Sequence, residues 1–178
     1  LEFRRVLFRS AIGASSMWAW QFAKMQHAAD LHGWTRFVSM QDQYNLIKRE
    51  EEREMLPMCT DMGVSSTPYS PLGKGRLTRP WGEQTDRSAQ DTVAKAFDLD
   101  SDAAVVDALH ALSVSRGIPM AQLAMAWVLS KPVVASCLVG ATKAHHLADA
   151  AAAGEVALAP DETAALEAPY VTQPAFWW

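Results

Sequence analysis

Several features that mark other protein classes are absent from this sequence of 178 residues. It contains two cysteines, Cys59 and Cys137, which lie far apart and form no Cys-x-x-Cys pair. A disulfide framework and a zinc site are therefore not expected, and a reducing cytoplasm is the predicted location. No apolar run approaches the ~20 residues that cross a bilayer, and nothing resembles a cleavable signal peptide, so we expect no membrane association.

The sequence also lacks an excess of positive charge and the common nucleotide-binding loops. Sixteen Lys and Arg residues against twenty Asp and Glu residues give a net charge of −4, which argues against a nucleic-acid partner. There is no Walker loop, no Gly-x-Gly-x-x-Gly after a strand, and no Gly-x-Ser-x-Gly around Ser70. His145 and His146 are adjacent and would point about 100° apart on a helix, so no metal site is expected.

The composition that remains is that of an ordinary globular protein, 49% hydrophobic and 20% charged. The length suits one domain or part of a larger one. We interpret residues 1–10, which include three arginines, as a non-native N-terminal segment, with a basic arm for an acidic surface as the alternative. The natural sequence is expected to begin near Ala11, and residues 11–178 to form the domain.

Short strand candidates alternate with segments of helical periodicity, an order that predicts a parallel sheet covered by helices. Strands are expected over residues 12–16, 37–41, 64–69 and 133–139, the last of them buried. Helices are expected from Trp18 to Gly33, from Lys48 to Gly63, from a cap at Ser101 to Gly117, and after Pro119, Lys143 and Pro160.

Two segments need an interpretation of their own. The charge run Lys48–Glu54 is interpreted as a solvated helix face with acids near the positive N-terminal end. Residues 70–91 have no periodicity and contain several glycines and prolines, which is typical of a long functional loop.

Polar and charged residues follow each strand, where the turns of βα units collect functional groups. Gly140–Lys143 opens a helix, whose free N–H groups suit a phosphate together with the Lys143 charge and His146 one turn on. The alternative is that Thr142 only caps the helix and Lys143 is solvated. Likewise, Tyr69 is either a core residue or a platform for an aromatic ligand, and Gln41 either binds an amide or is a satisfied buried group.

Five segments in order carry a resemblance to a known family. They are Ile12–Ser16, Gln41–Leu46, Arg49–Glu50, Tyr69–Leu72 and Gly140–Lys143, and in this order and spacing they resemble the second half of an aldo-keto reductase. The resemblance covers Ala11 to Tyr170. It implies an α/β fold, the C-terminal half of a (β/α)8 TIM barrel, with about four βα units plus a C-terminal helix.

The resemblance also implies that the chain binds NADPH in an extended pose across the strand ends. Ser15 and Gln41 would hydrogen-bond the nicotinamide carboxamide beside Ser16, and Tyr69 would stack on the ring. The other implied contacts are Ser70, Pro71, Leu72, Gly73 and Lys74 along the pyrophosphate, Arg87 over the cofactor, Gly140, Thr142, Lys143 and His146 at the 2′-phosphate, and Asp149 at the adenine amino group. Lys143 retains a charge for that phosphate, which favours NADPH over NADH, although His146 stands where Arg or Gln is frequent.

The implied function is that of an oxidoreductase that reduces aldehydes and ketones to alcohols. The family's catalytic Asp, Tyr, Lys and His come from the first half of the barrel, which would precede Ala11. We therefore assign no catalytic residue, expect this chain alone to be inactive, and expect a small-molecule carbonyl substrate for the full-length parent. The alternative is a non-catalytic nucleotide- or partner-binding module of the same fold.

Four βα units fall short of the ~250 residues that a closed barrel needs. They would leave two open sheet edges and an exposed apolar face, both of which favour association with other chains. Self-association through the open edges is therefore expected.

Overall fold

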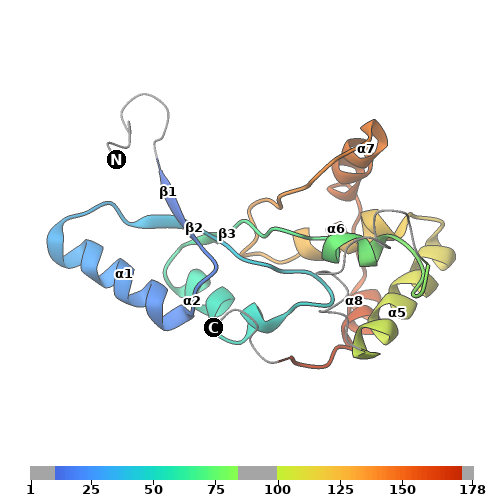
Figure 1. The fold of residues 1–178 in the computed structure, drawn as a ribbon, viewed down its shortest axis with the longest axis horizontal. Helices are drawn as coiled ribbons and strands as arrows, with labels where there is room; N and C mark the ends of the chain where they lie inside the picture. Colours follow the sequence, from blue (N-terminus) through green and yellow to red (C-terminus); the bar gives the residue numbers. More distant parts are fainter. Residues whose placement is uncertain (1–10, 84–99, 174–178) are drawn as a thin grey trace.

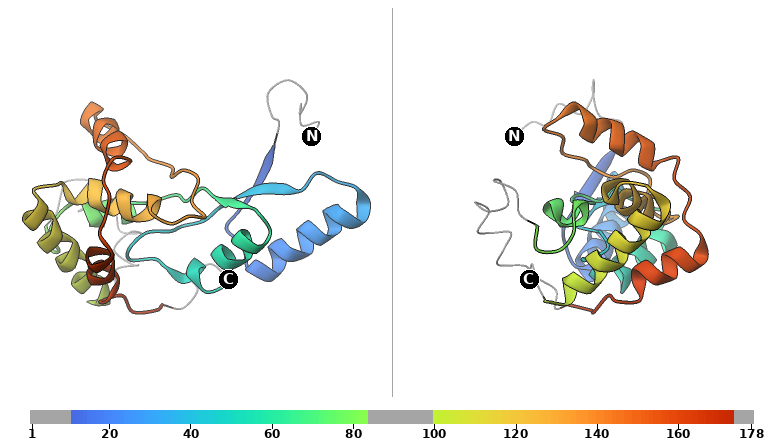
Figure 2. Two further views of the ribbon diagram at one scale, coloured as in Figure 1. Left: turned by 180° about the vertical axis from the view of Figure 1, so that it is seen from behind. Right: turned by 90° about the vertical axis from the view of Figure 1, so that its right-hand side faces the viewer.

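The structure is a computed structural model that describes residues 11–83 and 100–173 (Figure 1). Over these residues it is an α/β protein with a small parallel sheet. The sheet and the first helices occupy one end of an elongated molecule, and the later helices occupy the other (Figures 1 and 2).

The sheet has three parallel strands in the order β1-β2-β3. β1 spans Ile12–Ser15, β2 spans Phe37–Gln41 and β3 spans Ser65–Ser66. The register between β1 and β2 shifts between Ile12 and Gly13, which face Phe37 and Ser39, so Val38 has no partner on β1. The irregularity lets Phe37 and Met40 both face the helices although they are three residues apart.

Most helices lie where the periodicity predicts them. α1 (Ala19–His32) and α5 (Asp100–Arg116) end at Gly33 and Gly117, and α6 (Met120–Leu129) follows Pro119. The others are α2 (Met55–Asp61), α7 (Ala144–Ala153), α8 (Pro160–Glu167) and the 3-10 turns η1 (Glu50–Glu52) and η2 (Gly73–Thr78). No described helix is long and apolar enough to cross a membrane.

Two hydrophobic clusters hold these elements together. The smaller one packs α1 and α2 against one face of the sheet through Phe22, Met40 and Cys59. The larger one surrounds α6, whose Leu123 and Trp127 are fully buried and contact side chains of α5, α8 and the segment after β2. The site-bearing strand ends therefore lie between two packed cores.

Three local predictions are wrong. Residues 133–139 form no continuous buried strand, because only Val134 and Leu138 make isolated bridges and no described element covers the exposed Leu138. The charge run is not a solvated helix face, since it contains only the short 3-10 turn η1, and Arg49 is largely buried between Glu52 of the same run and Glu167 of α8. Ser101 lies in the first turn of α5, which begins at Asp100, and is not its cap.

Candidate functional site

The ends of β1 and β2 meet at the predicted nicotinamide contacts. The hydroxyl of Ser15 donates a hydrogen bond to the carbonyl oxygen of Gln41 over 2.8 Å, and the amide of Ser16 donates to the same oxygen over 3.1 Å. The predicted Ser15, Ser16 and Gln41 are thus neighbours, and the side chain of Gln41 is only partly buried.

The third and fourth turns continue this edge of the sheet. The amide of Tyr69 donates to the carbonyl oxygen of Asp42 over 2.8 Å, and the amide of Leu138 donates to that of Pro68 over 2.8 Å. Tyr69 bridges both Gln43 and Leu138 in the parallel sense. The segment that leads to Gly140 is therefore the next neighbour in the ladder, and all four turns emerge from one edge.

The turn after Tyr69 is tightly folded on its own backbone. The amide of Gly73 donates to the carbonyl oxygen of Ser70 over 3.0 Å, and that of Gly75 to Leu72 over 2.9 Å. Pro71 and Gly73 are buried, whereas Lys74 is exposed. This geometry aligns the predicted pyrophosphate contacts from Ser70 to Lys74 along one short segment.

Backbone strain is concentrated in these turns. Among the described residues, the non-glycine positions with positive φ are Ser16 (46°), Ser70 (53°) and Lys74 (56°). Such conformations cost of order 1–3 kcal/mol each for residues with a Cβ, and they persist at sites of function. All three lie in the turns for which the resemblance implies cofactor contacts.

The predicted phosphate site lies where α7 begins. Gly140, Thr142 and Lys143 are exposed, and Lys143 is the N-cap residue of α7. The amide of Thr142, one residue before the N-cap, donates to Nδ1 of His146 over 3.3 Å, so the His146 ring occupies a backbone donor next to this helix end.

The last predicted contacts have different outcomes. Asp149 accepts a hydrogen bond from Nε2 of Gln122 over 2.9 Å, which ties α7 to α6. Asp149 therefore has a structural partner, and its contact with adenine stays a prediction. Arg87 lies outside the described residues.

Asn45 and Asp42 were not predicted as site residues, although both belong to the motif after β2. The side chain of Asn45 is fully buried, and its Nδ2 donates to the carbonyl oxygen of Ser70 over 2.9 Å. The sequence signal for Asn45 was an amide side chain between two large hydrophobic residues, Tyr44 and Leu46, where a buried polar group needs hydrogen-bond partners.

Asp42 is a buried acid whose carboxyl oxygens have no hydrogen-bond partner among the described residues. Burial raises its pKa to about 7, although the nearby amide of Ser16 opposes the shift. Burial and the charge of Asp42 raise the pKa of Glu51 to about 8. Burial, Asp42 and Glu51 together raise the pKa of the Cys59 thiol to about 12, so Cys59 is not a nucleophile at neutral pH.

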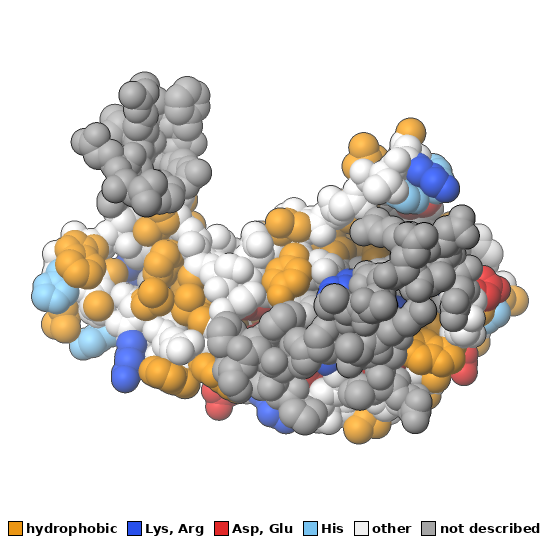
Figure 3. All heavy atoms as spheres, viewed as in Figure 1, with side chains coloured by type: hydrophobic (Ala, Val, Ile, Leu, Met, Phe, Trp, Pro, Cys, Tyr) orange, Lys and Arg blue, Asp and Glu red, His pale blue; other side chains and the backbone are white. Residues whose placement is uncertain are grey.

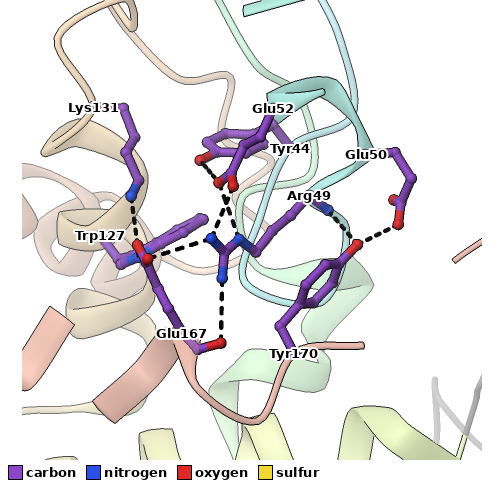
Figure 4. A network of polar contacts seen from close by, with 8 residues as sticks. All are labelled: Tyr44, Arg49, Glu50, Glu52, Trp127, Lys131, Glu167 and Tyr170. Carbon is purple, nitrogen blue, oxygen red and sulfur yellow. Dashed lines mark hydrogen bonds and ion pairs between the residues drawn. The ribbon is translucent and has the colours of Figure 1, made fainter. Parts of the chain in front are cut away.

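Arg49 is the centre of a polar network that joins η1, α6 and α8 (Figure 4). Its guanidinium contacts Glu52 at 2.8 Å and Glu167 at 3.3 Å. Glu52 also accepts a hydrogen bond from the hydroxyl of Tyr44 over 2.5 Å. Burial and Glu52 hold the pKa of Tyr44 far above its usual value, so this tyrosine is a poor proton donor.

The network extends to the C-terminal segment. Partial burial alone would raise the pKa of Glu167. Hydrogen bonds from Lys131 and Trp127 outweigh this effect and hold the pKa below its usual value, so this carboxylate stays ionised. The hydroxyl of Tyr170 accepts from the amide of Arg49 over 3.2 Å and donates to Glu50. Burial raises the pKa of Tyr170 above its usual value, and Glu50 adds to the shift.

No group of three or more His, Cys, Asp or Glu side chains with the spacing of a metal site occurs among the described residues. The arrangement offers instead backbone amides, hydroxyls, one amide side chain, one aromatic ring and two exposed lysines, Lys74 and Lys143, along a single edge. These groups suit an elongated polar ligand with an aromatic and an anionic end.

Comparison with known proteins gives consistent results. The model of the aldo/keto reductase family matches residues 10–170. The chain is 45% identical to versiconal hemiacetal acetate reductase of Aspergillus parasiticus over 166 residues, which cover 90% of this chain and 48% of that protein.

Two further relatives are aldo-keto reductases of Alternaria alternata and Fusarium vanettenii, each 42% identical. The matches cover 91% and 92% of this chain, and 44% and 45% of the respective relatives. The chain thus spans about half the length of the curated relatives that it matches.

Proposed function

The chain belongs to the aldo/keto reductase family, and we propose that it supplies the NADPH-binding half of an oxidoreductase that reduces aldehydes or ketones. The observation that carries this proposal is the strain at Ser16, Ser70 and Lys74. A fold keeps non-glycine residues at positive φ only where the surrounding contacts enforce it, and such positions concentrate at ligand sites. These three strained residues are also three of the implied cofactor contacts, and formation of the sheet alone does not require strain at these positions.

In this proposal the strand ends bind the nicotinamide. Gln41 and the hydroxyl of Ser15, with Ser16 beside them, offer donors and acceptors that match the carboxamide. The hydroxyl of Ser15 also donates to the Gln41 carbonyl oxygen, which holds these two residues together. Tyr69, which is half-buried between its neighbours in the ladder, presents its ring as the stacking platform.

The start of α7 takes the 2′-phosphate of the adenosine. Lys143 supplies a positive charge, and the Thr142 amide becomes available when the His146 ring turns away from it. Both residues are exposed, so a phosphate reaches them without rearrangement of the core.

The bound cofactor supplies the hydride that a carbonyl carbon accepts. The proton for the carbonyl oxygen comes, in this proposal, from outside this chain. The sequence has three tyrosines. The hydroxyls of Tyr44 and Tyr170 already donate hydrogen bonds to Glu52 and Glu50, and Tyr69 is assigned to the ring platform.

The test is a titration of the chain with NADPH and with NADH, in which the fluorescence of the reduced nicotinamide reports binding. Removal of one charged hydrogen bond to the 2′-phosphate weakens NADPH binding about tenfold in Lys143→Ala and leaves NADH binding unchanged. Lys24→Ala, which removes the same charge from the exposed face of α1, is the matched control and should bind NADPH like the parent.

Two results contradict the proposal. Equal affinity of the parent and Lys143→Ala for NADPH would remove the phosphate assignment. Oxidation of NADPH by this chain alone, dependent on an added aldehyde, would show that the catalytic residues do not lie elsewhere.

A further inference from the structure

We propose that Asn45 is a positioning residue, which fixes the Ser70–Gly75 segment from behind in the geometry that binds the cofactor pyrophosphate. The side chain of Asn45 is fully buried, so it acts through the backbone that it holds. Its Nδ2 donates to the carbonyl oxygen of Ser70 over 2.9 Å, and its Oδ1 accepts from the amide of Ile47 over 3.0 Å. The inference rests on the proposed function for its consequence on NADPH.

The turn from Asn45 to Lys48 is rigid enough to serve as a support. The amide of Asn45 donates to the carbonyl oxygen of Lys48 over 3.1 Å, and the reverse bond measures 3.0 Å. Because Oδ1 of Asn45 also holds the Ile47 amide, three hydrogen bonds close four residues. Few conformations remain open to such a turn, so the direction of the Nδ2 donor is fixed.

A second contact joins the same two segments. The side chain of Ile47 packs so closely on Gly73 that a Cβ added there would lie 2.9 Å from Cδ1 of Ile47. The support therefore contacts the Ser70–Gly75 segment at a polar point, Ser70, and an apolar point, Gly73, which lie three residues apart. Two points of contact fix the orientation of a short segment as well as its position.

The far side of the support is anchored by Gln173, which follows α8. Nε2 of Gln173 donates to Oδ1 of Asp102 over 3.0 Å, and its amide oxygen accepts from Lys48. The backbone amide of Gln173 donates to Glu50 over 3.0 Å. Gln173 is itself buried, so it holds the Asn45–Lys48 turn in place while Asn45 contacts Ser70.

The strained backbone of Ser70 makes this support necessary. Its carbonyl oxygen accepts from both Asn45 and the Gly73 amide while φ is held at 53°. Without the Asn45 donor, this partly buried carbonyl oxygen loses one of its two partners, and one fewer contact holds Ser70 in its strained conformation. The segment then samples conformations other than the one that the proposed function assigns to pyrophosphate binding.

The experiment compares Asn45→Asp with Gln26→Glu in the full chain. Each variant replaces a buried amide by an acid, keeps the accepting oxygen and removes a donor, since Gln26 donates to the Phe37 carbonyl oxygen and accepts from its amide. Gln26 lies on α1, away from the turns. The readouts are the NADPH dissociation constant and the hydrogen exchange of the Gly73, Gly75 and Leu77 amides.

Asn45→Asp should raise the NADPH dissociation constant about tenfold and speed exchange of these amides by a similar factor, whereas Gln26→Glu should change neither. Unchanged exchange at these amides, or faster exchange with unchanged NADPH affinity, overturns the inference. A parent chain that fails to bind NADPH defeats the proposed function, and exchange alone then decides whether Asn45 fixes the segment. If Asn45→Asp does not fold, Asn45→Ser and Gln26→Ser replace the pair.

Discussion

Gly73 lies where the proposed pyrophosphate segment meets the turn that supports it. Its φ is +54°, and a Cβ would approach Ile47 to 2.9 Å. We predict that Gly73→Ala lowers the free energy of unfolding by about 2–3 kcal/mol, because the left-handed backbone and the collision both act against alanine. Denaturant unfolding measures the loss.

Gly63→Ala is the matched control for Gly73→Ala. Gly63 has a similar φ of +65°, but nothing lies within 4 Å of its added Cβ. Its substitution should therefore cost only the backbone term, about 1 kcal/mol. Equal losses in the two variants would show that Ile47 yields and that the contact does not fix the segment.

Asp42 and Glu51 make stability depend on pH in a defined direction. Their pKa values rise from 3.8 to about 7 and from 4.5 to about 8 on folding. Between these limits the folded chain binds more protons than the unfolded chain, so the free energy of unfolding falls as the pH rises from about 4 to about 8.

Asp42→Asn tests this dependence. At pH 8 the variant should be more stable than the parent, because it removes a buried charge and the repulsion on Glu51. At pH 5 the two should differ little, since the carboxyl is then protonated. Urea unfolding at both values measures the effect, with the exposed Asp61→Asn as control; parallel curves for parent and Asp42→Asn would contradict it.

At the scale of elements, local sequence signals predicted most helices well and the segment 133–139, beside β3, poorly. Gly33, Gly117 and the Pro160 start are properties of a few adjacent residues, so α1, α5 and α8 lie where they were expected. The apolar run 133–139 suggested burial, but burial depends on what covers a strand, which no local pattern contains.

The charge run shows the same limit for polar residues. Lys48–Glu54 looks solvated in isolation, yet Glu167 and Tyr170, more than a hundred residues further on, come to Arg49. That the strand-end residues lie close together was predictable, because parallel strands bring their ends to one edge, while their contacts with a cofactor stay predictions. Asn45 was not singled out, because its role depends on a contact with Ser70 that only the folded chain makes.

Arg49 links elements whose sequence positions are far apart, and its loss should destabilise the whole chain. Arg49→Met leaves Glu52 and Glu167 without the cation that both contact. We predict a loss of about 2–3 kcal/mol in the free energy of unfolding, below the value for a fully buried pair because both carboxylates are partly exposed.

Arg36→Met serves as the control for Arg49→Met. Its ion pair with Asp30 is exposed on both sides, with 44% and 50% of the side chains accessible, so the expected loss is below about 1 kcal/mol. A similar small loss for Arg49→Met would mean that the network of Figure 4 does not hold α8 in place.

At the scale of the molecule, the sheet has an unpaired edge and exposed apolar side chains. Within the described residues β1 pairs only with β2, so its other edge offers free backbone groups. Trp20, Leu31, Trp34 and Val38 are each at least half exposed, and Figure 3 shows hydrophobic side chains gathered over this end. Open edges and apolar surface of this kind favour association between chains.

We therefore expect the chain to self-associate through its sheet, and light scattering after size-exclusion chromatography measures this directly. The average mass should rise with protein concentration over the micromolar range. Ile12→Lys places a charge on the edge strand and should shift the chain toward the monomer, because a lysine there must be desolvated when two edges pair. Trp20→Lys changes only the outer face of α1, so it separates pairing of edges from adhesion of apolar surface. A mass that stays that of one chain at every concentration would contradict self-association, and a monomer produced by Trp20→Lys but not by Ile12→Lys would assign it to the helix instead of the sheet.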